Sequence, residues 1–553
     1  MTEGVDLTIF GVMTVIFIIV TLLLGLYGYR NTKNNEEFLL GRNKTSPLII
    51  ALSYGATFLS ASAVIGFGGQ TAVHGMSLMW LCFLNLFLGL VVAFLVFGKR
   101  TRRLGRKLGA ATFADFLGKI YGSKGTRVFT AILILVMMPI YAAAVLKGGV
   151  NSLAVITGLT DYYNYILIAL SIIVAIYVVY GGIIAVMYND ALQALIMFLG
   201  MSVILVVTYL YTGGIEAGNN AMVDIWNIKM ADVSTLGVAP GFSGWTEFSE
   251  FGSKEWLTVV TTFIMGVGIG ALTQPQLAVR YMSAKSDRDL NKSLLIGSIF
   301  IMVVVGAAYT IGPLTNVYFF NEHGGMTSFE YISSLGLGTD FIIPQYILEV
   351  FKDITFGEIF VSLFLLSLIC ACISTISALM HTIGVSGGYD LFSVYKNKRY
   401  NTSGDSQSIN INRAFIVIFM VLVVVYCYLM PNDIIAKATS VFMGITAAAL
   451  LPAYFHCLYS KHPDRVAAIL SIAVGCIVYL FDALFINKGM SIFLPICKWI
   501  TGDAVLFPDS TIAFIDPLVI ALPLSIITMV VAIIVNKNRP ISNKDFCPGE
   551  DSE

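Results

Sequence analysis

The chain has 553 residues, of which 57% are hydrophobic and only 12% charged, and its formal net charge is zero. Soluble domains carry about 25% charged residues, so this composition excludes an ordinary soluble protein, and the balanced charge gives no sign of a nucleic-acid partner. The eight cysteines lack metal-ligand or secreted-disulfide spacing, and phosphate-binding loops and zinc-protease motifs are missing, which argues against an enzyme or an ATP-driven pump.

The predicted elements are apolar helices long enough to cross a bilayer, whose hydrocarbon core is about 30 Å thick. In chain order they are 8–28, 48–70, 75–98, 128–156, 160–180, 184–211, 256–279, 292–319, 357–388, 412–430, 434–458, 465–486 and 514–535. The expected fold class is therefore an all-α polytopic membrane protein with about 13 transmembrane helices.

The loops between these helices share the basic residues unevenly, and basic loops stay in the cytoplasm. With the N-terminus outside, the cytoplasmic segments hold most of the Lys and Arg residues: 29–47, 99–127, 280–291, 389–411, 459–464 and the tail after 535. The C-terminus is then cytoplasmic, in a multi-pass protein of the cell membrane. The external stretch 342–352 has helical periodicity and is predicted as a short surface helix or lid, and 398–411 as a flexible cytoplasmic linker.

Two of the predicted spans contain helix-interrupting sequence. The span 48–70 includes Ala56-Thr57-Phe58-Leu59-Ser60, and the span 256–279 includes three glycines from Gly266 to Gly270, followed by Gln274-Pro275. A third span carries small hydroxyl residues in Ala371-Cys372-Ile373-Ser374-Thr375. Irregular backbone at membrane depth is tolerated only where it is buried in protein or lines a cavity, and interrupted helices in two corresponding halves indicate the central site of a transporter.

Three motifs resemble those of the sodium/solute symporter family, which includes carriers of glucose, proline, pantothenate, acetate and sialic acid. They are 180–193 (Tyr-Gly-Gly-Ile-Ile-Ala-Val-Met-Tyr-Asn-Asp-Ala-Leu-Gln), 274–285 (Gln-Pro-Gln-Leu-Ala-Val-Arg-Tyr-Met-Ser-Ala-Lys) and the stretch from 371 that ends in Tyr389-Asp390-Leu391. The resemblance covers roughly residues 8–480 and implies a single transporter domain with a five-plus-five inverted repeat of the leucine-transporter type. Repeat one would span about 48–211 and repeat two about 256–458, with one leading helix (8–28) and two trailing helices (465–486 and 514–535).

The resemblance also implies a sodium site, with Na⁺ as the coupling ion. Its ligands would be the carbonyl groups of Ala56, Leu59 and Ala371 and the hydroxyl groups of Ser374 and Thr375. Ala56 and Leu59 are three residues apart, as are Ala371 and Ser374, so each pair shares a helix face, and neutral oxygens suit a hard cation. The alternative is that the two hydroxyl groups bond back to their own helix.

Asp190 is an intramembrane carboxylate, which is costly unless it pairs or binds an ion. In some family members the matching aspartate joins serines in a second sodium site, and Ser377 matches one of those serines. Ala378 breaks that pattern. A second sodium site at Asp190 and Ser377 and a purely structural role for Asp190 both stay open.

The residues expected to line the solute site do not match every branch of the family. Val267, Ala271 and Ser62 stand where proline carriers have aromatic residues, and Ala63 stands where sugar carriers have an amide, so neither proline nor glucose is expected. The closest likeness is to the pantothenate and organic-acid carriers. The predicted substrate-binding residues are Ser60, Ser62, Lys147, Val267, Ala271, Gln274 and Lys437.

Lys147 and Lys437 lie inside predicted spans, where a cation facing the pathway would favour an anionic solute. The alternative is that each side chain snorkels to the headgroups. The expected function is a secondary active symporter that couples inward sodium flow to uptake of a small organic solute, a carboxylate in the first instance, by alternating access. The other hypotheses are a symporter of amino acids or other neutral solutes, and a membrane sensor that acts through a partner. Beyond the solute and the lipid bilayer, no obligate protein partner is implied.

Overall fold

The computed structural model describes residues 5–41, 45–352, 354–396, 409–431, 435–491 and 495–537. Every regular element in these residues is helical. The α-helices are α1 (Leu7–Asn31), α2 (Asn35–Leu40), α3 (Pro47–Phe58), α4 (Phe67–His74), α5 (Met79–Leu86), α6 (Lys99–Lys107), α7 (Phe113–Ile120), α8 (Lys124–Ile156), α9 (Tyr163–Tyr211), α10 (Ile215–Lys229), α11 (Lys254–Leu257), α12 (Gly268–Gly270), α13 (Pro275–Ser283), α14 (Asp287–Glu322), α15 (Ser328–Ser334), α16 (Ile342–Val350), α17 (Gly357–Val385), α18 (Ser393–Lys396), α19 (Ile409–Leu429), α20 (Ile435–Tyr459), α21 (Arg465–Phe485), α22 (Ile496–Thr501) and α23 (Leu518–Lys537). Between them lie the π-helical segments η1 (Ser62–Gly66), η3 (Phe87–Gly98), η6 (Thr258–Val267) and η9 (Ser386–Phe392), and the 3₁₀ turns η2 (Gly75–Leu78), η4 (Thr160–Tyr162), η5 (Val233–Thr235), η7 (Ala271–Thr273), η8 (Thr339–Phe341) and η10 (Thr511–Phe514).

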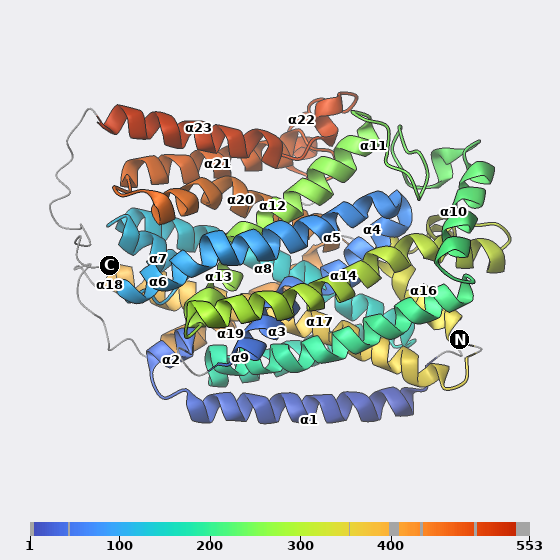
Figure 1. The fold of residues 1–553 in the computed structure, drawn as a ribbon, viewed down its shortest axis with the longest axis horizontal. Coiled ribbons are helices and arrows are strands. Elements are labelled where there is room, and N and C mark those ends of the chain that lie inside the picture. Colours follow the sequence, from blue (N-terminus) through green and yellow to red (C-terminus); the bar gives the residue numbers. More distant parts are fainter. Residues whose placement is uncertain are drawn as a thin grey trace.

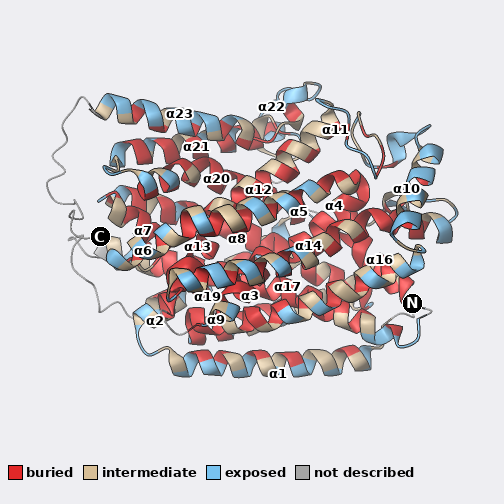
Figure 2. Cartoon of the chain, in the orientation of Figure 1, coloured by how far each residue is buried: buried red, intermediate tan, exposed pale blue. Residues whose placement is uncertain are grey.

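The long helices run roughly side by side, with α1 along one flank and α21 and α23 along the other (Figure 1). Helix α17 lies at the centre of the bundle and packs against α9, α8 and α19. Figure 2 shows buried residues concentrated in these inner helices, whereas α1 and α23 present mostly exposed or half-buried residues. Helix α1 begins at the end of the bundle that carries α10, and α23 finishes at the end that carries α6 and α18 (Figure 1). The first and last helices therefore fit a chain whose two ends lie on opposite faces of a membrane.

Eleven stretches in the described residues are long and apolar enough to span a membrane. The all-helical, multi-span architecture is confirmed. The number is lower than thirteen because two of these stretches run across a non-helical residue, Gly182 or Gly75, that lies where two predicted spans meet. Residues 160–211 join two predicted spans, and 62–107 joins the second half of the predicted span 48–70 to the next one.

The interruption predicted in the span 48–70 is confirmed. Ser46 caps α3 by accepting a hydrogen bond from the Ile49 N–H, and Pro47 follows at the first helical position. The helix ends at Phe58, and Leu59 has non-helical backbone angles (φ −95°, ψ 83°). The Ser60 hydroxyl group then accepts the Ser62 N–H at 3.0 Å, so a side chain replaces a helical backbone bond.

The interruption in the seventh predicted span lies at Gln274-Pro275, the second of the two features that suggested it, and not at the glycines. Helical backbone continues through Gly266, Gly268 and Gly270 in η6 and α12, and the angles leave the helical region at Gln274 (φ −73°, ψ 114°). Pro275 explains this position because it lacks an N–H and restricts the residue before it. The glycines instead allow close packing: a Cβ atom at Gly270 would collide with Met443.

Two other sequence-based assignments need correction, and a third falls largely outside the described residues. The predicted cytoplasmic loop 280–291 begins inside α13, whose nine residues are all buried, and continues into α14. The predicted surface helix 342–352 is helical as α16, but most of its residues are buried against the bundle. Of the predicted linker 398–411, residues 398–408 lie outside the described residues and 409–411 belong to α19.

Helix α9 contains a kink at Gly182, where the backbone (φ 57°, ψ −154°) is open only to glycine at low cost. Gly182→Ala should lower the free energy of unfolding by about 1–3 kcal/mol from backbone strain alone. An added Cβ atom would also press on Phe38. Thermal unfolding of the purified protein in detergent checks this, with Gly306→Ala on α14, where the new methyl group meets open space, as the matched control. Equal melting temperatures for the two variants would contradict the expectation.

Candidate functional site

The two hydroxyl-bearing segments singled out in the sequence meet in the core. Ser374 Oγ on α17 lies 3.0 Å from the carbonyl oxygen of Ala56 on α3, which is 318 residues away in the chain. It also lies 3.2 Å from the carbonyl oxygen of Ala371 in its own helix. Leu59 sits one turn beyond Ala56, at the end of α3. All four residues are buried. The structure thus brings α3 and α17 together at the residues predicted to share a sodium ion.

Thr375 is the fifth residue of this group. Its hydroxyl oxygen is buried and has no hydrogen-bond partner among the described residues. Buried hydroxyl groups are usually satisfied, so an unpaired one at this crossing is an oxygen available to a ligand. A set of neutral carbonyl and hydroxyl oxygens fits a hard cation of low charge, whereas thiolate or imidazole would be expected for a transition metal.

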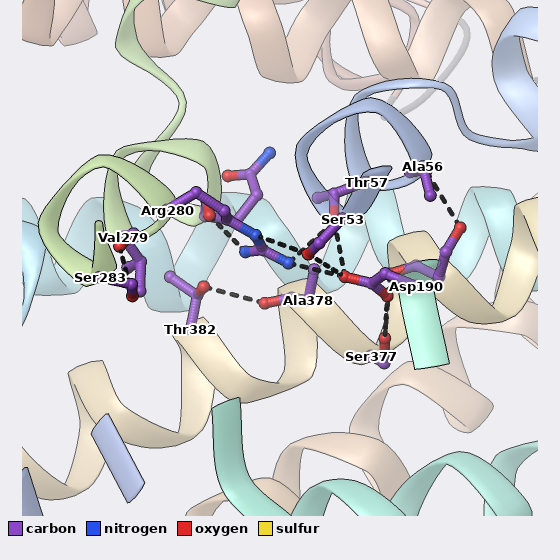
Figure 3. Close-up of polar contacts among 12 residues, drawn as sticks. Ser53, Ala56, Thr57, Asp190, Val279, Arg280, Ser283, Ser377, Ala378 and Thr382 are labelled. Carbon is purple, nitrogen blue, oxygen red and sulfur yellow. Dashed lines mark hydrogen bonds and ion pairs between the residues drawn. The ribbon is translucent and has the colours of Figure 1, made fainter. Parts of the chain in front are cut away.

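Asp190 lies next to this group in a fully buried ion pair with Arg280 (Figure 3). Its Oδ2 atom accepts hydrogen bonds from Arg280 Nη2 at 3.0 Å, Ser53 Oγ at 2.7 Å and Thr57 Oγ1 at 3.2 Å. The guanidinium group also donates to the Thr57 hydroxyl and to the Gln276 carbonyl. Arg280 therefore neutralises the carboxylate and ties α13 to α3 and α9. The sequence placed Arg280 in a loop and did not assign it this role.

The other oxygen of Asp190 is held loosely. Ser377 Oγ is 3.5 Å from Asp190 Oδ1 and 3.0 Å from the carbonyl oxygen of Ser374. Two other polar groups of α9, the Tyr177 hydroxyl and the Gln193 amide, are buried without a hydrogen-bond partner among the described residues. Asp190 and Ser377 lie close together, as a second sodium site would require. Asp190 also forms an ion pair with Arg280, as a structural role would require. Both predictions for Asp190 therefore stay open.

Ser60 and Ser62 lie at the break after α3, among side chains that the sequence did not single out. Ser60 Oγ is 3.1 Å from the Tyr141 hydroxyl group, and Thr439 Oγ1 donates to Ser62 Oγ at 2.7 Å. The rings of Tyr141 and Phe442 stack with centroids 4.9 Å apart. Hydroxyl groups and an aromatic wall from α8 and α20 thus surround the break. On the sequence alone these residues look like ordinary apolar-helix positions, so only their contacts reveal them.

The predicted residues of the other interrupted helix are also buried. Val267 belongs to η6 and Ala271 to η7, and both side chains are buried. Gln274 Nε2 donates to the Gly270 carbonyl at 2.8 Å and to Thr446 Oγ1 at 2.9 Å. The amide thus supplies a hydrogen bond to a backbone carbonyl group next to the break. A role for these three residues in solute binding stays a prediction.

The two intramembrane lysines are placed differently. Lys147 Nζ donates to the carbonyl oxygen of Met430, just after the end of α19, which occupies one of its three donors. Lys437, in the first turn of α20, lines a cavity of about 460 Å³ at the end of the bundle that carries α10 and α22. A role in the solute pathway stays a prediction for both lysines. The geometry supports it better for Lys437, which lines a cavity, than for Lys147, which bonds to a backbone carbonyl group.

The opposite end of the bundle is closed by ion pairs. Arg127 on α8 bonds to Asp390 in η9 at 2.9 Å and to Asp115 on α7 at 2.9 Å, and both carboxylates are fully buried. Arg102 and Arg103 on α6 both bond to Asp287 at the start of α14. These pairs join α6, α7, α8, α14 and η9 at the end that is rich in arginine.

Comparisons with known proteins agree with this picture. A model of the sodium:solute symporter family matches residues 38–475. The high-affinity proline transporter PutP of Bacillus subtilis (strain 168) is 27% identical over 480 residues, covering 86% of this chain and 91% of the relative. Sodium/proline symporter 2 of Staphylococcus saprophyticus is 24% identical over 485 residues and 87% of each chain. A solved structure of a Na⁺-coupled sialic acid symporter in a substrate-bound outward-open state superposes with a TM-score of 0.69 at 16% identity, over 96% of this chain and 97% of that one, which is a likeness of fold.

Proposed function

The chain belongs to the sodium:solute symporter family, and from this premise we propose that it couples inward sodium flow to uptake of a small amino acid of the proline type. Both curated relatives described above are proline transporters, which favours proline over the organic acid expected from the sequence. Proline also carries a carboxylate, so the cationic residues considered for an organic acid remain relevant. The expectation against proline, drawn from Val267, Ala271 and Ser62, is therefore reversed in this proposal.

The side chains around the break in α3 support a proline-type solute. This chain has Val267, Ala271 and Ser62 where proline carriers are expected to have aromatic residues. Tyr141 and Phe442 nevertheless provide a stacked aromatic wall beside Ser60. Such a wall can contact an apolar ring, and the neighbouring hydroxyl groups of Ser60, Ser62 and Thr439 can bind its polar groups.

The observation that carries the sodium part of the proposal is the meeting of Ser374 with the Ala56 carbonyl, beside the unpaired Thr375 hydroxyl group. In the proposal, Ala56, Leu59, Ala371, Ser374 and Thr375 hold one sodium ion that bridges α3 and α17. The ion supplies about 2.3 kcal/mol per charge for each 100 mV of membrane potential, in addition to its concentration gradient. Sodium and solute should each raise the affinity of the other, as linkage requires.

The proposal uses one sodium ion and gives Asp190 a structural role. Arg280 already supplies a positive charge to Asp190 at 3.0 Å within a fully buried pair. A second cation on the same carboxylate would lie close to the guanidinium group and would be repelled by it. Ala378, which breaks the serine pattern of the two-sodium members, is consistent with this assignment.

The proposed orientation in the membrane follows from the arginine residues at one end of the bundle. Arg102, Arg103 and Arg127 gather at the α6 end, which the excess of basic residues assigns to the cytoplasm. The end that carries α10 and the cavity at Lys437 would then face outward. Alternating access requires the inner ion pairs to open when the solute leaves.

The test is uptake of labelled L-proline by the purified protein in proteoliposomes, with an inward gradient of sodium or of potassium. We expect accumulation above equilibrium only with the sodium gradient, and its loss when a sodium ionophore is added. Competition by unlabelled amino acids and organic acids then ranks the solutes. Uptake that ignores the sodium gradient would refute the coupling, and competition by organic acids but not by L-proline would restore the carboxylate as the solute.

A further inference from the structure

The cavity at Lys437 is built from parts of the chain that are far apart. Besides Lys437, its walls include His74, Glu255 and Phe263 from the helical core, and Lys488 and Phe514 from the segment between α21 and α23. Its volume of about 460 Å³ is in the range of small-molecule sites. The segment that holds Lys488 and Phe514 lies outside both predicted five-helix repeats.

The charged groups in the cavity leave a positive surface. Glu255 is fully buried, and its two oxygens are taken by His74 Nδ1 at 2.5 Å and by the backbone N–H of Ala239 at 2.8 Å. Among the described residues, no hydrogen bond or ion pair reaches the side-chain ammonium group of Lys437 or of Lys488, although the backbone of Lys488 bonds to Ala513 and Ser491. Lys488 instead stands over the Phe514 ring at 5.9 Å, and Lys254 approaches the same ring at 5.1 Å. Within the described part of the chain, two lysines without an ion-pair partner therefore line a cavity whose carboxylate, Glu255, is already bound.

The cavity borders residues that neighbour the candidate solute position. Phe263 forms part of its wall and packs edge-to-face on Phe67, with ring centroids 5.8 Å apart. Val267, one of the predicted solute residues, is one helical turn beyond Phe263. On α20, Lys437 lies two residues before Thr439, whose hydroxyl group donates to Ser62. The cavity and the break in α3 therefore share neighbours on η6 and α20.

We propose that this cavity is an outer binding site that captures the carboxylate of the incoming solute on Lys437 and Lys488 before the solute reaches Ser60 and Ser62. The inference rests on the proposed function for the nature of the solute. It assigns a task to the trailing segment, since Lys488 belongs to the chain between α21 and α23. Positive charge at the mouth of a cleft raises the association rate of an anionic group, and the effect weakens with salt.

The first test measures how fast each lysine of the purified full-length protein is acylated by an amine-reactive reagent, with peptide mass spectrometry as the readout. The probes are acetate, L-proline and L-prolinamide, which lacks the carboxylate, in potassium buffer of constant ionic strength. Acetate or L-proline should slow acylation of Lys437 and Lys488 at least threefold, and L-prolinamide should not. Lys498, exposed on α22 near the same end, is the internal control. No protection by either carboxylate, or equal protection by L-prolinamide, would overturn the proposal.

The second test uses Lys488→Gln in proteoliposomes, with Lys488→Arg as the charge-conserving variant and Lys498→Gln as the matched control. We expect Lys488→Gln to lower the rate of L-proline uptake about tenfold at subsaturating solute and low salt, with recovery at saturating solute. Lys488→Arg should retain the wild-type rate. Wild-type kinetics in Lys488→Gln would overturn the proposal. A wild-type protein without sodium-driven uptake would instead refute the proposed function, and the acylation experiment, which contains no sodium, would still decide on the outer site.

Discussion

Arg280→Met is expected to destabilise the protein more than any other single change considered for this chain. The substitution leaves Asp190 as a buried carboxylate without its counter-charge, since Arg280 is its one ion-pair partner among the described residues. Removing one member of a buried pair costs about 3–5 kcal/mol. Ser53 and Thr57 would still donate to the carboxylate, but neutral donors cannot balance its charge. Thermal unfolding in detergent and the yield of folded protein after solubilisation measure the effect.

The double variant Asp190→Asn/Arg280→Met distinguishes the cost of the unpaired charge from the cost of lost packing around Arg280. With both charges removed, most of the lost stability should return, because no uncompensated charge remains in the core. Arg288→Met, at an exposed arginine near the start of α14, is the matched control and should melt with the wild type. If Arg280→Met were as stable as the wild type, Arg280 could not be the group that neutralises Asp190.

Thr375→Val should raise the sodium concentration that gives half-maximal uptake by about tenfold, which corresponds to about 1.4 kcal/mol of lost ion binding. The substitution keeps the branched shape of the side chain and removes the hydroxyl oxygen, which has no other partner among the described residues. Ser374→Ala should act in the same direction and also remove the contact between α17 and the Ala56 carbonyl. Uptake measured over a range of sodium concentrations, at fixed ionic strength and saturating solute, gives both values.

Thr382→Val is the control for this prediction. Thr382 is on the same helix and is equally buried, but its hydroxyl group donates to the Ala378 carbonyl of its own helix at 2.9 Å. Its loss should leave the sodium dependence unchanged. If Thr375→Val and Ser374→Ala behaved like Thr382→Val, the ion site would have to lie elsewhere.

The pattern of residues along the chain predicted those features that depend on local chemistry. The break after Phe58 follows from small hydroxyl residues in an apolar span, and the kink at Gly182 falls between two predicted spans. Even the approach of Ala56 to Ser374, 318 residues apart, was expected, but only because the motifs around them resemble a known family. The local residue pattern and the resemblance to a family together therefore predict the main architecture.

Features that depend on three-dimensional packing were missed. Arg280 follows the last apolar residue of a predicted span, so the rule that arginines lie in cytoplasmic loops placed it outside the membrane. Only the fold shows that α13 is buried throughout and that Asp190 faces it. Tyr141, Phe442 and Thr439 carried no signal because aromatic and hydroxyl residues are common in membrane helices. Their importance comes from their contacts across α8, α20 and the break in α3.

The ion pair between Asp190 and Arg280 also bears on how the protein is made. Asp190 is synthesised 90 residues before Arg280, so α9 leaves the ribosome while the partner of its carboxylate does not yet exist. A lone carboxylate is costly in the hydrocarbon core. We therefore expect α9 to remain shallow, or in contact with the insertion machinery, until α13 arrives, and chains truncated between the two residues to be degraded. The helices before α13 would then reach their final depth only after α13 has been inserted.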